Sequence, residues 1–191
     1  MDFLDPIQPP PAPEPGRPRR PWVGPPGDWL GAPSVGPGIV GRSESVVVVL
    51  QSIVAYPVGC DLQIEIRARR VPGQAEEDWM STVEGVSGHD LYGNDGPALP
   101  AGLRVEVHFA DGHMATNLFQ YSGSASGNPW DASAERPMWL WPLPPAKPFD
   151  VVIEWLSVGI PLTRTEVDGA RVAEAAALAQ PLWPDATGAE S

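Results

Sequence analysis

Two runs near the C-terminal end decide the fold: residues 139–145 have the sequence WLWPLPP, and residues 149–155 have the sequence FDVVIEW. Their aromatic and β-branched residues favour strands, and the prolines between the two runs are typical of a corner. Residues 160–167 predict a further strand. Asp168 is of a residue type that caps helix N-termini, and the helix predicted after it covers residues 169–180. This segment therefore predicts strands followed by one short C-terminal helix.

Upstream of these runs, the hydrophobic period is two. Residues 46–54 are apolar on both faces, as in a central strand, and residues 62–69 alternate between apolar and polar side chains. The turn sequence at residues 56–59 joins them into a predicted hairpin. Residues 103–109 alternate in the same way and precede the dipeptide at 111–112, Asp-Gly, which is typical of two-residue hairpin turns. The chain therefore predicts an all-β fold, an antiparallel β-sandwich with one short C-terminal helix.

Proline and glycine mark the segments that we expect to lack regular structure. Twelve of the 25 prolines lie in residues 1–41, and such a composition does not repay the entropy cost of ordering, which predicts a disordered proline-rich tail. Residues 72–102 and 117–136 are expected to be loops, and residues 185–191 to be a disordered C-terminus. The predicted β-sandwich domain therefore spans residues 42–184.

Charge and cysteine content limit the partners and the compartment. The chain has 191 residues and a formal net charge of −12, which disfavours nucleic acid, because phosphate binding depends on clustered lysine and arginine. The apolar run at residues 46–55 is too short to span a membrane. Cys60 is the single cysteine, which excludes an internal disulfide framework and favours the cytoplasm. We expect a soluble cytoplasmic protein that binds neither nucleic acid nor membranes.

Six short motifs follow one another along the chain: AYP at residues 55–57 with Gly59 after it, FADG at 109–112, WPLPP at 141–145, EW at 154–155, GIP at 159–161 and VDG at 167–169. In this order they resemble an uncharacterised family of actinobacterial proteins. The resemblance covers roughly residues 45–184. No activity is known for that family, so the resemblance implies no catalytic or binding residue for this chain.

The second predicted hairpin carries the candidate metal ligands Glu106, His108 and His113. A two-residue turn pairs Ala110 with His113 and places both imidazoles on one wet face, with the carboxylate close by. Two imidazoles and a carboxylate are ligands that zinc accepts. The remaining histidine, His89, lies in a predicted loop. This arrangement suggests a metal-dependent hydrolytic enzyme built on the 106–113 hairpin.

The chain has eight tryptophans, and Trp183, which follows the predicted helix, is expected to attach that helix to the sandwich. The other seven divide into two groups by their sequence context. Trp139, Trp141 and Trp155 fall at strand positions of matching parity, and we expect them to pack together in the core. The other candidates lie in the predicted tail or loops, and flat indoles there are typical of a carbohydrate-stacking platform: Trp22, Trp29, Trp79 and Trp130.

The sequence favours a non-catalytic interaction or accessory module that needs no cofactor. A protein partner is expected to bind either a sheet surface or the proline-rich tail, where residues 15–21 have the spacing of a polyproline ligand. Glu154, in an apolar strand, is expected to form an ion pair with an arginine such as Arg164. A metal-dependent hydrolytic enzyme and a carbohydrate-binding domain stay open as alternatives.

Overall fold

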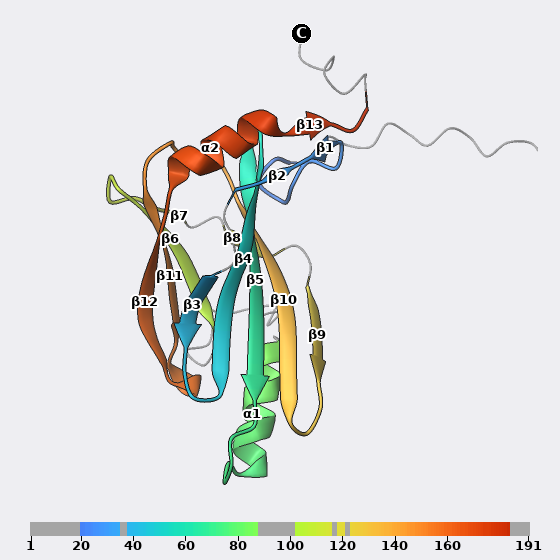
Figure 1. Cartoon of the computed structure of the whole chain (residues 1–191), viewed down its shortest axis with the longest axis vertical. Coiled ribbons are helices and arrows are strands. Elements are labelled where there is room, and N and C mark those ends of the chain that lie inside the picture. The colour runs from blue at the N-terminus through green and yellow to red at the C-terminus, as the bar shows by residue number, and fades with distance from the viewer. Residues whose placement is uncertain (1–19, 35–37, 88–101, 116–117, 121–122, 184–191) are drawn as a thin grey trace, which may run out of the picture.

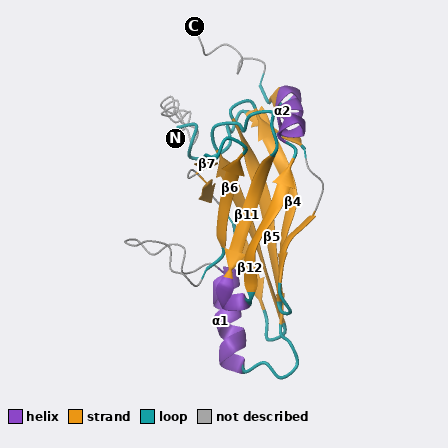
Figure 2. Ribbon diagram, turned by 90° about the vertical axis from the view of Figure 1, so that its left-hand side faces the viewer, coloured by secondary structure: helices purple, strands orange, loops and turns teal. Residues whose placement is uncertain are grey.

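In the computed structural model, residues 20–34, 38–87, 102–115, 118–120 and 123–183 are described. Within these residues, the strands form a seven-stranded sheet, a four-stranded sheet and a short two-stranded ribbon, all with antiparallel pairing (Figures 1 and 2). The prediction of a mostly β fold with antiparallel sheets is confirmed. Most of the predicted N-terminal tail, the predicted C-terminal tail at 185–191 and His89 lie outside the described residues.

Three long strands form the centre of the seven-stranded sheet: β4 (Val46–Tyr56), β5 (Gly59–Arg69) and β10 (Asp131–Leu140). Shorter strands pair with β4 and β10: β2 (Ala32–Pro33), β3 (Gly38–Arg42), β8 (Leu118–Gln120) and β9 (Ser124–Gly127). The four-stranded sheet has the order β12 (Ile160–Val167), β11 (Phe149–Trp155), β6 (Arg104–Phe109) and β7 (Met114–Ala115). The two-stranded ribbon joins β1 (Trp29–Leu30) and β13 (Gln180–Pro181).

The hairpin formed by β4 and β5 carries much of the apolar face that the large sheet buries, and its turn lies where the sequence predicted it. A bulge interrupts the pairing at Gln51, between Leu50 and the residue after Gln51. Because the bulge adds one residue to β4, the buried positions change parity there: Val48 and Leu50 are buried before it, and Ile53 and Ala55 are buried after it. The polar interruption in the apolar run therefore leaves the buried face continuous.

The four-stranded sheet contributes side chains to the same hydrophobic core. Alternate residues of β11 belong to one cluster with the inward residues of β5, which shows that the two sheets share a core. In β11 these residues are Phe149, Val151, Ile153 and Trp155.

The predicted boundary of the N-terminal tail, at residue 41, is wrong, because regular structure begins earlier in the chain. Strands β1, β2 and β3 lie at least partly within that range, and β3 pairs with β4. β3 also meets the other sheet, because Val40 is buried and Gly41 packs against Ile153 and Ile160, leaving no room for a β-carbon. Pairing and burial therefore repay the ordering cost that composition alone predicted to be prohibitive.

A second helix, α1 (Glu76–Ser87), occupies part of the predicted loop at 72–102, so the prediction of a single helix is corrected. Acidic residues at positions 76–78 form its first turn, where carboxylates interact favourably with the helix dipole. Figure 2 shows α1 beyond one end of the four-stranded sheet. One side of the helix is buried, at Trp79, Thr82 and Val86.

Side chains from both sheets contact the C-terminal end of α1. Arg136 of β10 is buried and donates hydrogen bonds to the carbonyl oxygens of Gly85, at 3.0 Å, and Val86, at 2.7 Å. Carbonyls in the last turn of a helix have no partner within it, and a positive charge there also suits the helix dipole. From β11, the Trp155 ring packs so closely on Gly85 that a β-carbon there would lie 2.9 Å from it.

Helix α2 (Gly169–Leu178) occupies most of the range 169–180 and lies across one end of β4 (Figure 1). Asp168 precedes it, and its carboxylate accepts hydrogen bonds from the backbone N–H groups of Ala170, at 3.0 Å, and Arg171, at 3.4 Å. The small buried side chains of α2 allow close approach to the strand. They are Val172, Ala175 and Ala176.

The tryptophans predicted to pack together do not form one cluster. Trp155 lies in the shared core, whereas Trp139 donates its indole N–H to the Pro21 carbonyl oxygen at 2.8 Å. Trp141 meets Trp22 with 5.9 Å between ring centroids. Trp139 and Trp155 belong to strands of different sheets, and Trp141 follows the end of β10, so equal parity along the sequence does not bring the three side chains together.

We predict that Gly59→Ala lowers the free energy of unfolding by about 1–3 kcal/mol, as is typical of overpacking. The added β-carbon would lie 2.5 Å from the Trp139 ring and 2.6 Å from the Leu140 carbonyl oxygen. Gly38→Ala is the matched control, because its β-carbon would meet nothing within 4 Å. Urea denaturation measures both variants, and equal destabilisation would contradict the described packing.

Candidate functional site

Strand β6 separates apolar from charged side chains by its period of two. Val107 is fully buried, and its neighbours in alternation, Val105 and Phe109, pack against the core. The other three residues of the strand point to the opposite side of the four-stranded sheet: Arg104, Glu106 and His108. Together with the charged side chains of β11 and β12 on that side, they form what we call the charged face.

The β6–β7 turn differs from the predicted one. His108 lies opposite Met114, and the Phe109 N–H donates to the His113 carbonyl oxygen at 2.8 Å, so the loop contains three residues instead of two. Gly112 has φ +85°, the left-handed conformation that such loops require. The Asp111 carboxylate accepts the His113 N–H at 3.0 Å and further stabilises this turn.

The longer loop separates the predicted metal ligands. Because His113 is paired with Phe109, it has the parity of the core side of β6, opposite to that of His108. Its imidazole is 82% exposed and lies 3.2 Å from the Asp111 carboxylate. The structure therefore brings together Glu106 and His108 and places His113 elsewhere. Within the described residues, no group of three or more His, Cys, Asp or Glu side chains is arranged to hold a metal ion.

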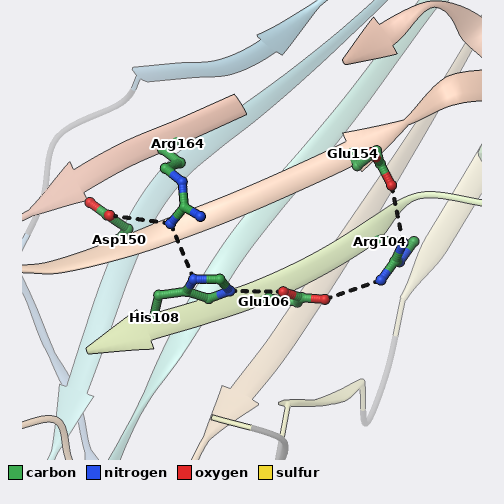
Figure 3. Close-up of polar contacts among 6 residues, drawn as sticks. All are labelled: Arg104, Glu106, His108, Asp150, Glu154 and Arg164. Carbon is green, nitrogen blue, oxygen red and sulfur yellow. Dashed lines mark hydrogen bonds and ion pairs between the residues drawn. The ribbon is translucent and has the colours of Figure 1, made fainter. Parts of the chain in front are cut away.

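The His108 imidazole links Glu106 of β6 to Arg164 of β12 on the charged face (Figure 3). His108 Nε2 lies 2.8 Å from the Glu106 carboxylate, and His108 Nδ1 lies 3.1 Å from a terminal nitrogen of Arg164. Because a guanidinium only donates hydrogen bonds, Nδ1 accepts one from Arg164, and Nε2–H donates to Glu106. The neutral imidazole protonated on Nε2 satisfies both contacts.

Three ion pairs extend this series of contacts toward its ends. Arg104 lies 3.3 Å from Glu106 and 3.1 Å from Glu154, and Arg164 lies 3.6 Å from Asp150. The predicted pairing of Glu154 with an arginine is confirmed, but that arginine is Arg104 instead of Arg164. Glu154 lies opposite Arg104 across the β6–β11 pair, whereas Arg164 lies opposite Val152 across the β11–β12 pair. Register decides which opposite charges meet.

The contacts on the charged face lower the pKa of one carboxyl group, that of Glu106. The hydrogen bond from His108 lowers the pKa of Glu106 below its ordinary value, and the nearby positive charge of Arg104 acts in the same direction. Partial burial opposes the effect without cancelling it. Glu106 therefore carries a negative charge that its neighbours hold in place.

Hollows lie at both ends of the charged face. The larger has a volume of about 310 Å³ and includes His108, Asp150 and Arg164 in its lining, while the smaller, of about 100 Å³, includes Arg104 and Glu154. Apolar side chains lie beside the charges, since Leu162 of β12 is 54% exposed and Met114 of β7 is 57% exposed. The face offers fixed charges of both signs next to apolar surface.

Two of the candidates for a carbohydrate platform have clear environments. Trp79 is buried in α1, so it is not available for stacking, whereas Trp130 is 71% exposed.

Comparison of the chain with protein-family models, curated proteins and solved structures finds no match. No helix among the described residues has the length and apolar character needed to cross a membrane.

We predict that NMR titration of Glu106 gives a pKa below 4.5 and that His108→Ala raises this value, because the strongest cause of the shift is removed. Folding lowers this pKa, so the associated stabilisation is present above pH 4.5 and is lost as the pH falls through the folded-state value. His113→Ala is the control, since His113 contacts Asp111 instead. A Glu106 pKa that responds equally to both substitutions would contradict the contacts.

Proposed function

We propose that the chain is a non-catalytic, cytoplasmic β-sandwich module that binds a protein partner on the charged face. The observation that carries this proposal is the chain of contacts from Asp150 through His108 to Glu154, in which charged side chains on three neighbouring strands hold one another in position beside the exposed Leu162. Such a pattern suits recognition of a complementary surface.

Fixed charges favour specific recognition for two reasons. Alternating signs attract a partner with the matching pattern and repel others, which affects specificity and association rate more than affinity. Side chains that are already hydrogen-bonded in position also lose less conformational freedom when a partner binds. Arg104 illustrates this, because it bridges carboxylates on two strands while its side chain remains 57% exposed.

The exposed apolar side chains add the other component of a binding surface. Interfaces combine an apolar centre with polar groups around it. Leu162 lines the smaller hollow together with Arg104 and Glu106, so apolar and charged groups meet at one place on the face. A partner that covers Leu162 would also cover the end of the charged face that Arg104 and Glu154 form.

We predict that Arg164→Glu lowers recovery of the main partner at least about tenfold in affinity purification from lysate of the organism that encodes the chain. The substitution places a negative charge between Asp150 and His108, and like charges across an interface are costly. Each bound protein is quantified by mass spectrometry against wild type.

Arg171→Glu is the matched control, because Arg171 is also exposed and also lies 3.6 Å from an aspartate, Asp168, but belongs to α2. It should recover the partner at the wild-type level. Circular dichroism confirms that both variants fold, as expected for the loss of surface ion pairs. Equal recovery by wild type and both variants would refute binding through the charged face.

A further inference from the structure

The opposite surface of the molecule carries an arginine-lined hollow of about 460 Å³, on the outer side of the seven-stranded sheet. Strand register places Arg42 of β3 opposite Val47 of β4, and Val47 opposite Arg67 of β5. Residues directly opposite one another point to the same side of a sheet, so both arginines project outward. Arg69, two residues after Arg67, shares this side, and all three arginines line the hollow.

The charge of this hollow is opposite to that of the chain. Its lining contains three arginines and one carboxylate residue, Glu44, whereas the whole chain has a formal net charge of −12. A concentration of positive charge in a recess raises the local concentration of anions. The arginines therefore mark a place on an otherwise acidic molecule where an anion is favoured.

Many of the guanidinium donors remain available to a ligand. Arg42 makes no side-chain hydrogen bond or ion pair with any described residue. Arg69 donates from Nε to the Glu44 carbonyl oxygen at 3.3 Å, which leaves its terminal nitrogens free of that contact. Arg67 forms an ion pair with Glu65 through one terminal nitrogen, and its side chain is 69% exposed. Each guanidinium has five N–H donors, so these contacts use only a few.

The backbone contact of Arg69 also orients its side chain. Anchoring Nε to a carbonyl oxygen restricts the guanidinium without neutralising its charge, and an oriented fork is the geometry that binds phosphate or carboxylate through two parallel hydrogen bonds. Arg42 and Arg67 are separated by one intervening strand, which places their α-carbons about 10 Å apart. A ligand that reaches both needs more than one anionic group.

We propose that this hollow binds a small polyanion whose phosphate or carboxylate groups contact Arg42, Arg67 and Arg69. The site lies on the other sheet from the charged face and does not depend on the function proposed above. A lysine at any of the three positions would keep the charge but lose the paired donors.

The test uses the full chain with inorganic pyrophosphate and citrate as probes at low ionic strength, followed by NMR of backbone amides and arginine Nε–H groups. The proposal predicts saturable shifts in β3 and β5 with a dissociation constant below about 1 mM for at least one probe. Tighter binding of pyrophosphate identifies phosphate as the preferred group, and tighter binding of citrate identifies carboxylate. No saturable shift with either probe overturns the proposal.

The double variant Arg42→Gln, Arg67→Gln should weaken binding at least about tenfold, because charge-assisted hydrogen bonds are lost. Arg42→Gln alone should also weaken it, and Arg42 makes no side-chain hydrogen bond or ion pair with any described residue that this variant would remove. Arg171→Gln on α2 is the control and should bind like wild type. Equal weakening by Arg171→Gln and the double variant would show nonspecific charge binding and overturn the proposal.

Discussion

The apolar inner face of the β4–β5 hairpin is the constraint on which the other elements depend. Its two strands of 11 residues bury one continuous face, because the bulge at Gln51 corrects the parity of β4. The hydrophobic effect requires that this face be covered. The four-stranded sheet covers it, and the buried residues of α1 and α2 complete the same cluster. β3 then packs against the second sheet through Gly41.

Because the inner faces form the core, the outer faces remain for the binding that we propose. Period-two alternation sends Glu106 and His108 of β6 to one outer surface and Arg67 of β5 to another. On the first surface, opposite charges satisfy one another and give a patterned face. On the second, arginine predominates in the lining of the hollow. The two surfaces therefore differ in charge pattern, although the same alternation produces both.

The sequence predicted β4, β5, β6, β11 and β12 well, because alternation is a local property that burial then enforces. The prediction of a loop at residues 117–136 is corrected, because β8, β9 and the first six residues of β10 lie in that range. The buried residues of β10 there include Ala132 and Ala134, whose small side chains give only a weak apolar alternation. Helix α1, whose buried residues include Trp79, lies in a segment for which the sequence predicts a loop. The acidic residues at 76–78, which are typical of a first helical turn, were the signal that could have predicted this helix. The metal-ligand hypothesis depended on a two-residue turn, and one additional loop residue moved His113 to the other parity. The contact between Arg164 and His108 joins residues that are 56 positions apart in the sequence, and only strand register reveals it.

Site-specific photo-crosslinking in the cells that encode the chain tests the central claim most directly. A photoreactive residue replaces Leu162 on the charged face, and the same residue replaces Leu178 on α2 in a second version of the full chain; both leucines are more than half exposed. The account predicts a discrete protein adduct from position 162 that is absent from position 178. The same adduct from both positions, or an adduct from position 178 alone, would contradict recognition through the charged face.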